Sequence, residues 1–137
     1  MGTRIRRVDY FYAMVKDEPG EAYRMLTRLA SGEVNLLAFK AIPLGAGTTQ
    51  LVLFPDSVER LAHVAERIGI VLTGPHRAFL VQGDDRLGAL IDVHAKLSQA
   101  RVNVYASDGV TDGQGGYGYV LYVRPEDYES AAGLLNV

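Results

Sequence analysis

Two turns in the sequence place a glycine just before a predicted helix, and an asparagine follows fifteen residues later in both. The pairs are Gly20 with Asn35 and Gly88 with Asn103. A glycine at a helix start lets a ligand approach the backbone, where first-turn amides are unsatisfied donors at the positive end of the helix dipole. That position suits a carboxylate, and an asparagine amide offers both donors and an acceptor. Together these groups match the ammonium and carboxylate of a free α-amino acid.

Other chemistry has less support. The chain has no cysteine, which excludes disulfides and thiolate chemistry and is compatible with a reducing compartment. His63 and His76 show no metal-ligand spacing, and no nucleophile elbow, catalytic carboxylate pair or phosphate loop appears. His94 stands where the first half of the chain has Leu26, and we expect it to be half-buried at the edge of the core. We predict no catalytic residue, no metal, no cofactor and no enzymatic activity.

The composition also limits the partners. The 137 residues include 48% hydrophobic residues, and 14 Lys and Arg against 16 Asp and Glu give a net charge of −2. This balance provides no general attraction to nucleic acid or to anionic lipid. The N-terminus is basic, but no long apolar run follows it, so neither a signal peptide nor a membrane span is predicted. We expect a cytoplasmic protein.

A run of alternating aromatic residues, 116–122, nearly reproduces the core motif of RNA-recognition domains. The basic residue that opens that motif is replaced by Gly115. From His76 to the end the chain has five basic and eight acidic residues, so this surface would repel phosphates. We therefore predict no nucleic-acid binding and interpret Tyr117 and Tyr119 as packing residues.

Periodicity and turn residues predict the elements that position these groups. The first half should contain strands at 8–15, 34–41, 48–54 and 70–72, a helix ending at Gly32 and a second helix ending at Gly69. A turn at 73–75 should follow. The second half should contain strands at 78–82, 102–107 and 117–123, with helices at 87–99 and from 126. Only 134–137 remain for a final strand, so that strand is predicted to be short or missing.

The two halves are an internal repeat. A shift of 68 residues pairs identical residues, namely Asp17 with Asp85, Gly20 with Gly88, Leu29 with Leu97, Val34 with Val102, Asn35 with Asn103 and Ala38 with Ala106. A shift of 70, after a two-residue insertion expected in the second hairpin turn, pairs Pro55 with Pro125. We predict an α+β protein of two ferredoxin-like βαββαβ repeats, 5–73 and 76–137, each with an antiparallel sheet and helices on one face.

The turns Asp17-Glu18-Pro19-Gly20 and Asp85-Arg86-Leu87-Gly88, with the strand starts at 34–36 and 102–104, resemble a tandem pair of ACT domains over 8–72 and 77–133. Leu87 departs from the pattern, since the family often has proline there, and so does the short final strand. The resemblance implies amino-acid sites at interfaces between ACT units. The implied ligand-binding residues are Asp17, Pro19, Gly20 and Asn35 in the first repeat and Asp85, Leu87, Gly88 and Asn103 in the second.

These observations favour a small regulatory protein that binds a free amino acid and acts on a partner enzyme or regulator. The first strand is apolar on both faces, with Tyr10, Tyr12 and Met14 on one and Phe11 on the other, which predicts a homo-oligomer. One alternative is a structural or interaction module that has lost its ligand sites. A less favoured alternative is an enzyme on the ferredoxin-like scaffold, with His94 or a tyrosine as acid or base.

Overall fold

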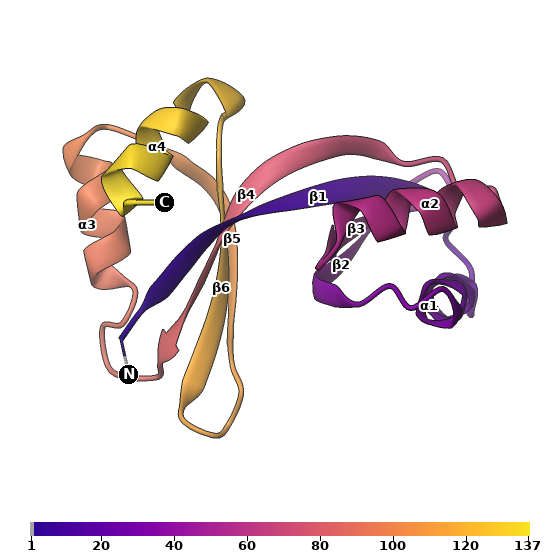
Figure 1. The fold of residues 1–137 in the computed structure, drawn as a ribbon, viewed down its shortest axis with the longest axis horizontal. Helices are drawn as coiled ribbons and strands as arrows, with labels where there is room; N and C mark the ends of the chain where they lie inside the picture. The colour runs from indigo at the N-terminus through magenta and orange to yellow at the C-terminus, as the bar shows by residue number, and fades with distance from the viewer. Residues whose placement is uncertain (1) are drawn as a thin grey trace. The chain divides into compact units, whose positions relative to one another are not determined.

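The computed structural model describes residues 2–137, which form six antiparallel strands and four α-helices (Figure 1). This is the predicted α+β class with two βαββαβ-type repeats. The elements are β1 (Arg4–Lys16), α1 (Glu21–Ser31), β2 (Leu36–Gly45), β3 (Thr48–Pro55), α2 (Val58–Ile68), β4 (Thr73–Asp84), α3 (Ile91–Gln99), β5 (Val104–Thr111), β6 (Gly116–Val123), a 3-10 turn (Pro125–Asp127) and α4 (Tyr128–Leu135). In the described residues no helix is both long and apolar enough to cross a membrane.

The chain divides into two compact units. One unit is Asp9–His76, in which β3 pairs with both β1 and β2. The other consists of the segment ending at Val8 together with Arg77–Val137, and in it β6 pairs with both β4 and β5. Each of β1 and β4 therefore contributes residues to both units. The repeat bounds 5–73 and 76–137 rest on the sequence comparison and stay a prediction.

Two predictions between the repeats were wrong. Residues 70–72 form no strand, and the predicted turn at 73–75 is the beginning of β4. The end of α2 explains the first error. Gly69 has a φ of 76°, and the amide of Ile70 donates to the carbonyl of Ala65 at 2.9 Å, which is the hydrogen bond of a Schellman cap. This cap ties Ile70 to the helix rather than to a strand.

The predicted two-residue insertion in the second hairpin turn was also misplaced. The ladders pair Phe11 with Leu53 in one unit and Phe79 with Leu121 in the other, and the 68-residue shift persists to the ends of both hairpins. The two hairpin turns therefore have equal length. The shift becomes 70 only at the start of α4, so the extra residues lie after β6, where the 3-10 turn Pro125–Asp127 occurs.

Each unit buries its helices against one face of its strands, as the sequence predicted. In the Asp9–His76 unit the core includes Phe11, Leu29, Leu51, Leu53 and Leu61. In the other unit α3 and α4 supply Leu97 and Tyr128, and the strands supply Phe79, Val81 and Leu121. The inward strand positions alternate with a period of two, which is why a strand pattern was visible in the sequence.

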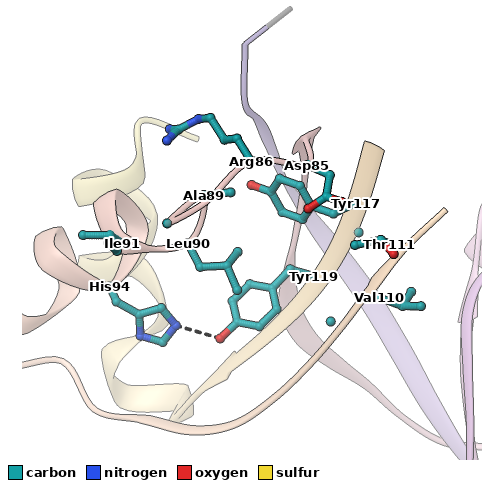
Figure 2. A pocket seen from close by; sticks show the side chains of 13 residues that line it. Asp85, Arg86, Ala89, Leu90, Ile91, His94, Val110, Thr111, Tyr117 and Tyr119 are labelled. Carbon is teal, nitrogen blue, oxygen red and sulfur yellow. Dashed lines mark hydrogen bonds between the residues drawn. The ribbon is translucent and has the colours of Figure 1, made fainter. Parts of the chain in front are cut away.

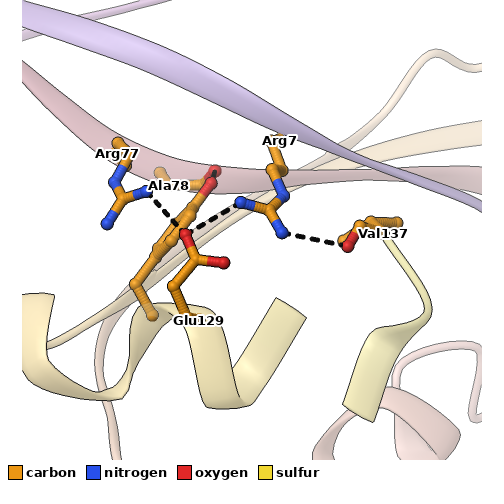
Figure 3. A network of polar contacts seen from close by, with 6 residues as sticks. Arg7, Arg77, Ala78, Glu129 and Val137 are labelled. Atoms are coloured by element: carbon orange, nitrogen blue, oxygen red, sulfur yellow. Dashed lines mark hydrogen bonds and ion pairs between the residues drawn. The ribbon is translucent and has the colours of Figure 1, made fainter. Parts of the chain in front are cut away.

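The fourth-strand position of the second repeat is filled from the other end of the chain. Residues 134–137 form no strand, which confirms the predicted absence. The first part of β1 instead lies beside β4, where Arg4 Nη2 donates to Gln82 Oε1 at 3.3 Å. Figure 3 shows a second link, in which Arg7 donates to Glu129 Oε2 at 2.9 Å and to the carbonyl of Val137 at 3.1 Å. The opening residues of the chain thus complete this unit.

Candidate ligand-binding site

A cavity of about 750 Å³ lies in the second repeat, within the unit that contains Arg77–Val137. Figure 2 shows it between the loop after β4, the beginning of α3, the end of β5 and the beginning of β6. Apolar side chains and ring faces form most of its surface, and Asp85 and Arg86 supply charge. Its lining includes Asp85, Arg86, Gly88, Leu90, Ile91, His94, Val110, Tyr117 and Tyr119.

The loop after β4 differs from its counterpart in the first repeat. The helix predicted at 87–99 begins only at Ile91, because 87–90 form a separate turn. In that turn the amide of Ala89 donates a hydrogen bond to the carbonyl of Arg86 at 3.1 Å. The amide of Ile91 donates a hydrogen bond to the carbonyl of Gly88 at 3.0 Å. Gly88 therefore lies before the helix rather than at its start. The same turn places Leu90 and Ile91 on the cavity wall.

His94 and Tyr119 form a polar pair on this wall. His94 Nε2 lies 2.7 Å from Tyr119 Oη, and Figure 2 shows the two side chains meeting across the cavity. Tyr119 is buried in the core cluster and His94 is half-buried, as the sequence predicted for both. The equivalent residues of the first repeat are Leu26 and Leu51, so the polar pair belongs to the second repeat alone.

The predicted residues of the second repeat are only partly brought together. Asp85 and Gly88 line the large cavity. Asn103 instead lines a smaller cavity of about 460 Å³, together with Ser98 and Arg101. His94 lines both cavities. Leu87 is fully exposed and is not among the residues lining either of them.

In the first repeat, Gly20 occupies the predicted position at the start of α1, with a φ of 88°. A Cβ built on Gly20 would lie 3.2 Å from Nη1 of Arg24, and Nη2 of Arg24 lies 3.2 Å from Glu21 Oε2. A guanidinium therefore covers this helix start. Asp17, Pro19 and Asn35 are all exposed.

The hairpin turn beside the cavity is fixed by Asp112. Its Oδ1 accepts hydrogen bonds from the backbone amides of Gln114 at 2.7 Å and Gly116 at 3.0 Å. These hydrogen bonds hold the pKa of the Asp112 carboxyl below its usual value. The amide of Asp85 donates to the carbonyl of Gly115 at 2.9 Å. The cavity loop and the hairpin turn are therefore joined to one another.

Sequence reasoning missed Tyr119 as the partner of His94, and it missed the apolar wall of Leu90 and Ile91. One signal was present. At His94 the second repeat replaces an inward leucine of the first with a polar ring. Positions at which two copies of a fold differ in polarity were thus a better guide to this cavity than the positions that they share.

No family model matches the sequence, and no curated protein matches it. Several solved structures do match over nearly the whole chain. A protein of Bacteroides thetaiotaomicron has a TM-score of 0.77 at 13% identity, covering 98% of this chain and 88% of the other. The ligand-free regulatory subunit of aspartate kinase from Thermus thermophilus has a TM-score of 0.65 at 12% identity, covering 99% and 95%. The aspartokinase alpha and beta subunits have a TM-score of 0.56 at 16% identity, covering 98% and 95%. At these identities the likeness shows the fold.

Proposed function

Because the chain has a tandem ACT-like fold, we propose that it is a regulatory protein that binds a free amino acid, and that it is not an enzyme. The regulatory subunits of aspartate kinase with this fold support a regulatory role, since the similarity covers 99% of the chain. The observation that carries the proposal is the cavity of about 750 Å³ beside the loop after β4. Its volume is within the roughly 300 to 1,000 Å³ typical of small-molecule sites.

The charges at this cavity suit an amino-acid zwitterion. The Asp85 carboxylate can accept hydrogen bonds from an ammonium group, and the Arg86 guanidinium can donate to a carboxylate. The side chain of Arg86 is 58% exposed, and its ion pair with Asp92 Oδ2 is long at 3.9 Å. Arg86 is therefore available to a ligand at modest cost.

We assign the ligand to the second repeat, with Asp85 and Gly88 at the site. A role for Asn103 would be at the neighbouring cavity, and Leu87 would act only through its backbone or through a partner. The sites predicted at Asp17, Pro19, Gly20 and Asn35 stay a prediction for the first repeat. We further propose a cytoplasmic homo-oligomer that acts on a partner enzyme or regulator. The exposed side chains of Tyr105 at 53% and Val110 at 73% support an interface on β5.

A thermal-shift screen against the twenty amino acids tests the proposal. A ligand at about 100 times its Kd should stabilise the protein by roughly 2.7 kcal/mol, which raises the melting temperature measurably. We expect such a shift with one amino acid or a few related ones. Absence of a shift with all twenty would favour the alternative of an interaction module without a ligand.

A further inference from the structure

The two repeats have the same ladder register but different walls at the position of the cavity. In the first repeat the two positions equivalent to His94 and Tyr119 are leucines, and one of them, Leu51, is fully buried. In the second repeat Tyr119 and His94 replace Leu51 and Leu26, and the turn at 87–90 delays the start of α3. The cavity therefore lies where the second copy departs from the first. This difference bears on which ligand the cavity can hold.

We infer that the cavity selects an α-amino acid with a large apolar side chain, aromatic or branched aliphatic, and that Tyr119 with His94 closes the end that the side chain reaches. The inference rests on the proposed function and specifies its ligand. It also assigns specificity to two residues outside the glycine and asparagine pattern of the sequence.

The apolar wall argues for a large side chain. Ile91 is 66% exposed and lines the cavity together with Leu90. Val110 pairs with Gly118, so its side chain lies on the other face of the sheet and adds nothing to this wall. A ligand side chain laid against Ile91 and Leu90 would remove this apolar surface from water, and the gain grows with each buried methylene group. With glycine or alanine as the ligand, this apolar wall would stay in contact with water. Contact between this surface and a large apolar side chain would therefore contribute the most to the binding free energy.

The polar pair argues against a polar side chain. Tyr119 Oη and His94 Nε2 are 2.7 Å apart, so each already satisfies the other. At the end formed by Tyr119 and His94, the cavity therefore presents mainly ring surface. The hydroxyl of Tyr117, which has no hydrogen-bond partner among the described residues, is a separate polar group of the lining. A carboxylate or amide on the ligand side chain would be desolvated at the end formed by Tyr119 and His94 without a new partner, which is unfavourable. An aromatic ring could instead face the ring of Tyr119.

The charged groups orient such a ligand. Asp85 and Arg86 lie in the loop before the turn, whereas His94 lies one helical turn into α3 (Figure 2). With its ammonium and carboxylate at the loop, the ligand would extend its side chain along Leu90 toward Tyr119. The first repeat lacks this arrangement, because Glu18 replaces Arg86 and two leucines replace His94 and Tyr119.

Calorimetric titration of the 137-residue chain with four amino acids tests the inference. We expect L-phenylalanine or L-leucine to bind at least about 100-fold more tightly than glycine, because several buried methylene equivalents separate them. L-Aspartate should bind no better than glycine. If glycine or L-aspartate binds as tightly as the apolar amino acids, the selectivity is wrong while the proposed function stands. If none of the twenty amino acids binds, both fail.

A matched pair of variants tests the location. Ile91→Asp places a carboxylate on the apolar wall, and the exposure of Ile91 lets the chain fold normally. Tyr23→Asp makes the same change at the equivalent position of the first repeat, where Tyr23 is 73% exposed. We expect Ile91→Asp to weaken the tighter of the two apolar ligands at least about tenfold and Tyr23→Asp to leave its affinity unchanged. Loss of binding in Tyr23→Asp with binding retained in Ile91→Asp would overturn the assignment.

The two specificity residues have their own test. Tyr119→Phe keeps the ring and frees His94 Nε2, so it should relax the discrimination against L-aspartate while keeping the affinity for L-phenylalanine within about threefold. Circular dichroism melting verifies that the variant is folded. Unchanged discrimination in a folded Tyr119→Phe variant would remove the pair from the inference.

Discussion

At the scale of single residues, the carboxylate of Glu129 contacts two arginines. Its Oε2 accepts hydrogen bonds from Arg7 at 2.9 Å and from Arg77 at 2.8 Å. The guanidinium of Arg77 also lies over the ring of Tyr128, at 4.2 Å from the centroid. The hydrogen bond from Arg7, and then that from Arg77, holds the pKa of the Glu129 carboxyl below its usual value. One carboxylate thus joins β1, β4 and α4.

The lowered pKa of Glu129 sets the direction of a pH dependence. An acid with a depressed folded-state pKa stabilises the fold above its unfolded pKa, and this contribution is lost as the pH falls through the folded value. We expect Glu129→Gln to lower the urea midpoint at pH 7 and to have little effect at about pH 3. The control is Glu126→Gln, an exposed acid in the adjacent 3-10 turn. Equal losses at both pH values would contradict this ion-pair account.

Removal of the hydroxyl should have opposite effects on the stability of the protein at two tyrosines of the same unit. In the described residues, Tyr117 Oη is buried without a hydrogen-bond partner, whereas Tyr128 Oη donates to the carbonyl of Ala78 at 3.0 Å. Tyr117→Phe should therefore leave the stability unchanged or raise it by up to about 1 kcal/mol, and Tyr128→Phe should lower it by about 0.5–1.5 kcal/mol. Denaturant unfolding of both variants measures the contrast. A loss of stability in Tyr117→Phe would reveal a missed partner.

At the scale of elements, the space around a glycine differs between the end of α1 and the middle of α4. A Cβ on Gly32, the C-cap of α1, would lie 2.6 Å from Cγ2 of Val64 on α2. A Cβ on Gly133 in α4 would meet nothing within 4 Å. We expect Gly32→Ala to destabilise the protein by about 1–3 kcal/mol through overpacking and Gly133→Ala to stabilise it by about 0.5–1 kcal/mol through helix propensity. Equal melting temperatures for the two variants would contradict this packing of α1 against α2.

The elements that the sequence predicted correctly are those with local signals. The start of α2 has such a signal, because Asp56 and Ser57, either of which can cap a helix, precede an apolar helical pattern. In the structure the cap is Ser57, whose side chain accepts a hydrogen bond from the amide of Arg60 at 3.2 Å. The beginning of β4 has no such signal, because a Gly-Pro pair favours a turn locally and only pairing with β1, some sixty residues away, makes it a strand. Long-range pairing overrode the local preference there.

The candidate site was predictable only in part, for a similar reason. Asp85 and Gly88 share one loop, so their proximity follows from the chain. His94 and Tyr119 are 25 residues apart on a helix and a strand, and their contact depends on packing between the two elements. Asn103 was expected beside Gly88, but the beginning of β5 places it at the smaller cavity. The spacing of residues in a sequence does not determine the face on which a cavity opens.

On the scale of the whole molecule, one unit depends on both ends of the chain. Ile5 packs against the core cluster of Phe79 and Leu121, and Val8 is buried. We expect deletion of residues 2–8 to accelerate hydrogen exchange at the amides of 77–84 strongly, because β4 loses a neighbouring strand and Glu129 loses Arg7. Exchange in 48–55 should change less. Unaltered exchange throughout β4 would show that the opening segment adds nothing to this unit.

The interruption of one unit by the other has a consequence for the order in which the protein is made. Asp9–His76 is continuous, so it can fold on the ribosome as soon as its last residue has left the exit tunnel. The residues before it emerge first, but their neighbours lie in 77–137, and they must wait until that segment has been translated. The cavity, which lies between 85 and 119, therefore forms late in synthesis, and a truncated chain ending near His76 would contain one folded repeat and an unused leading strand.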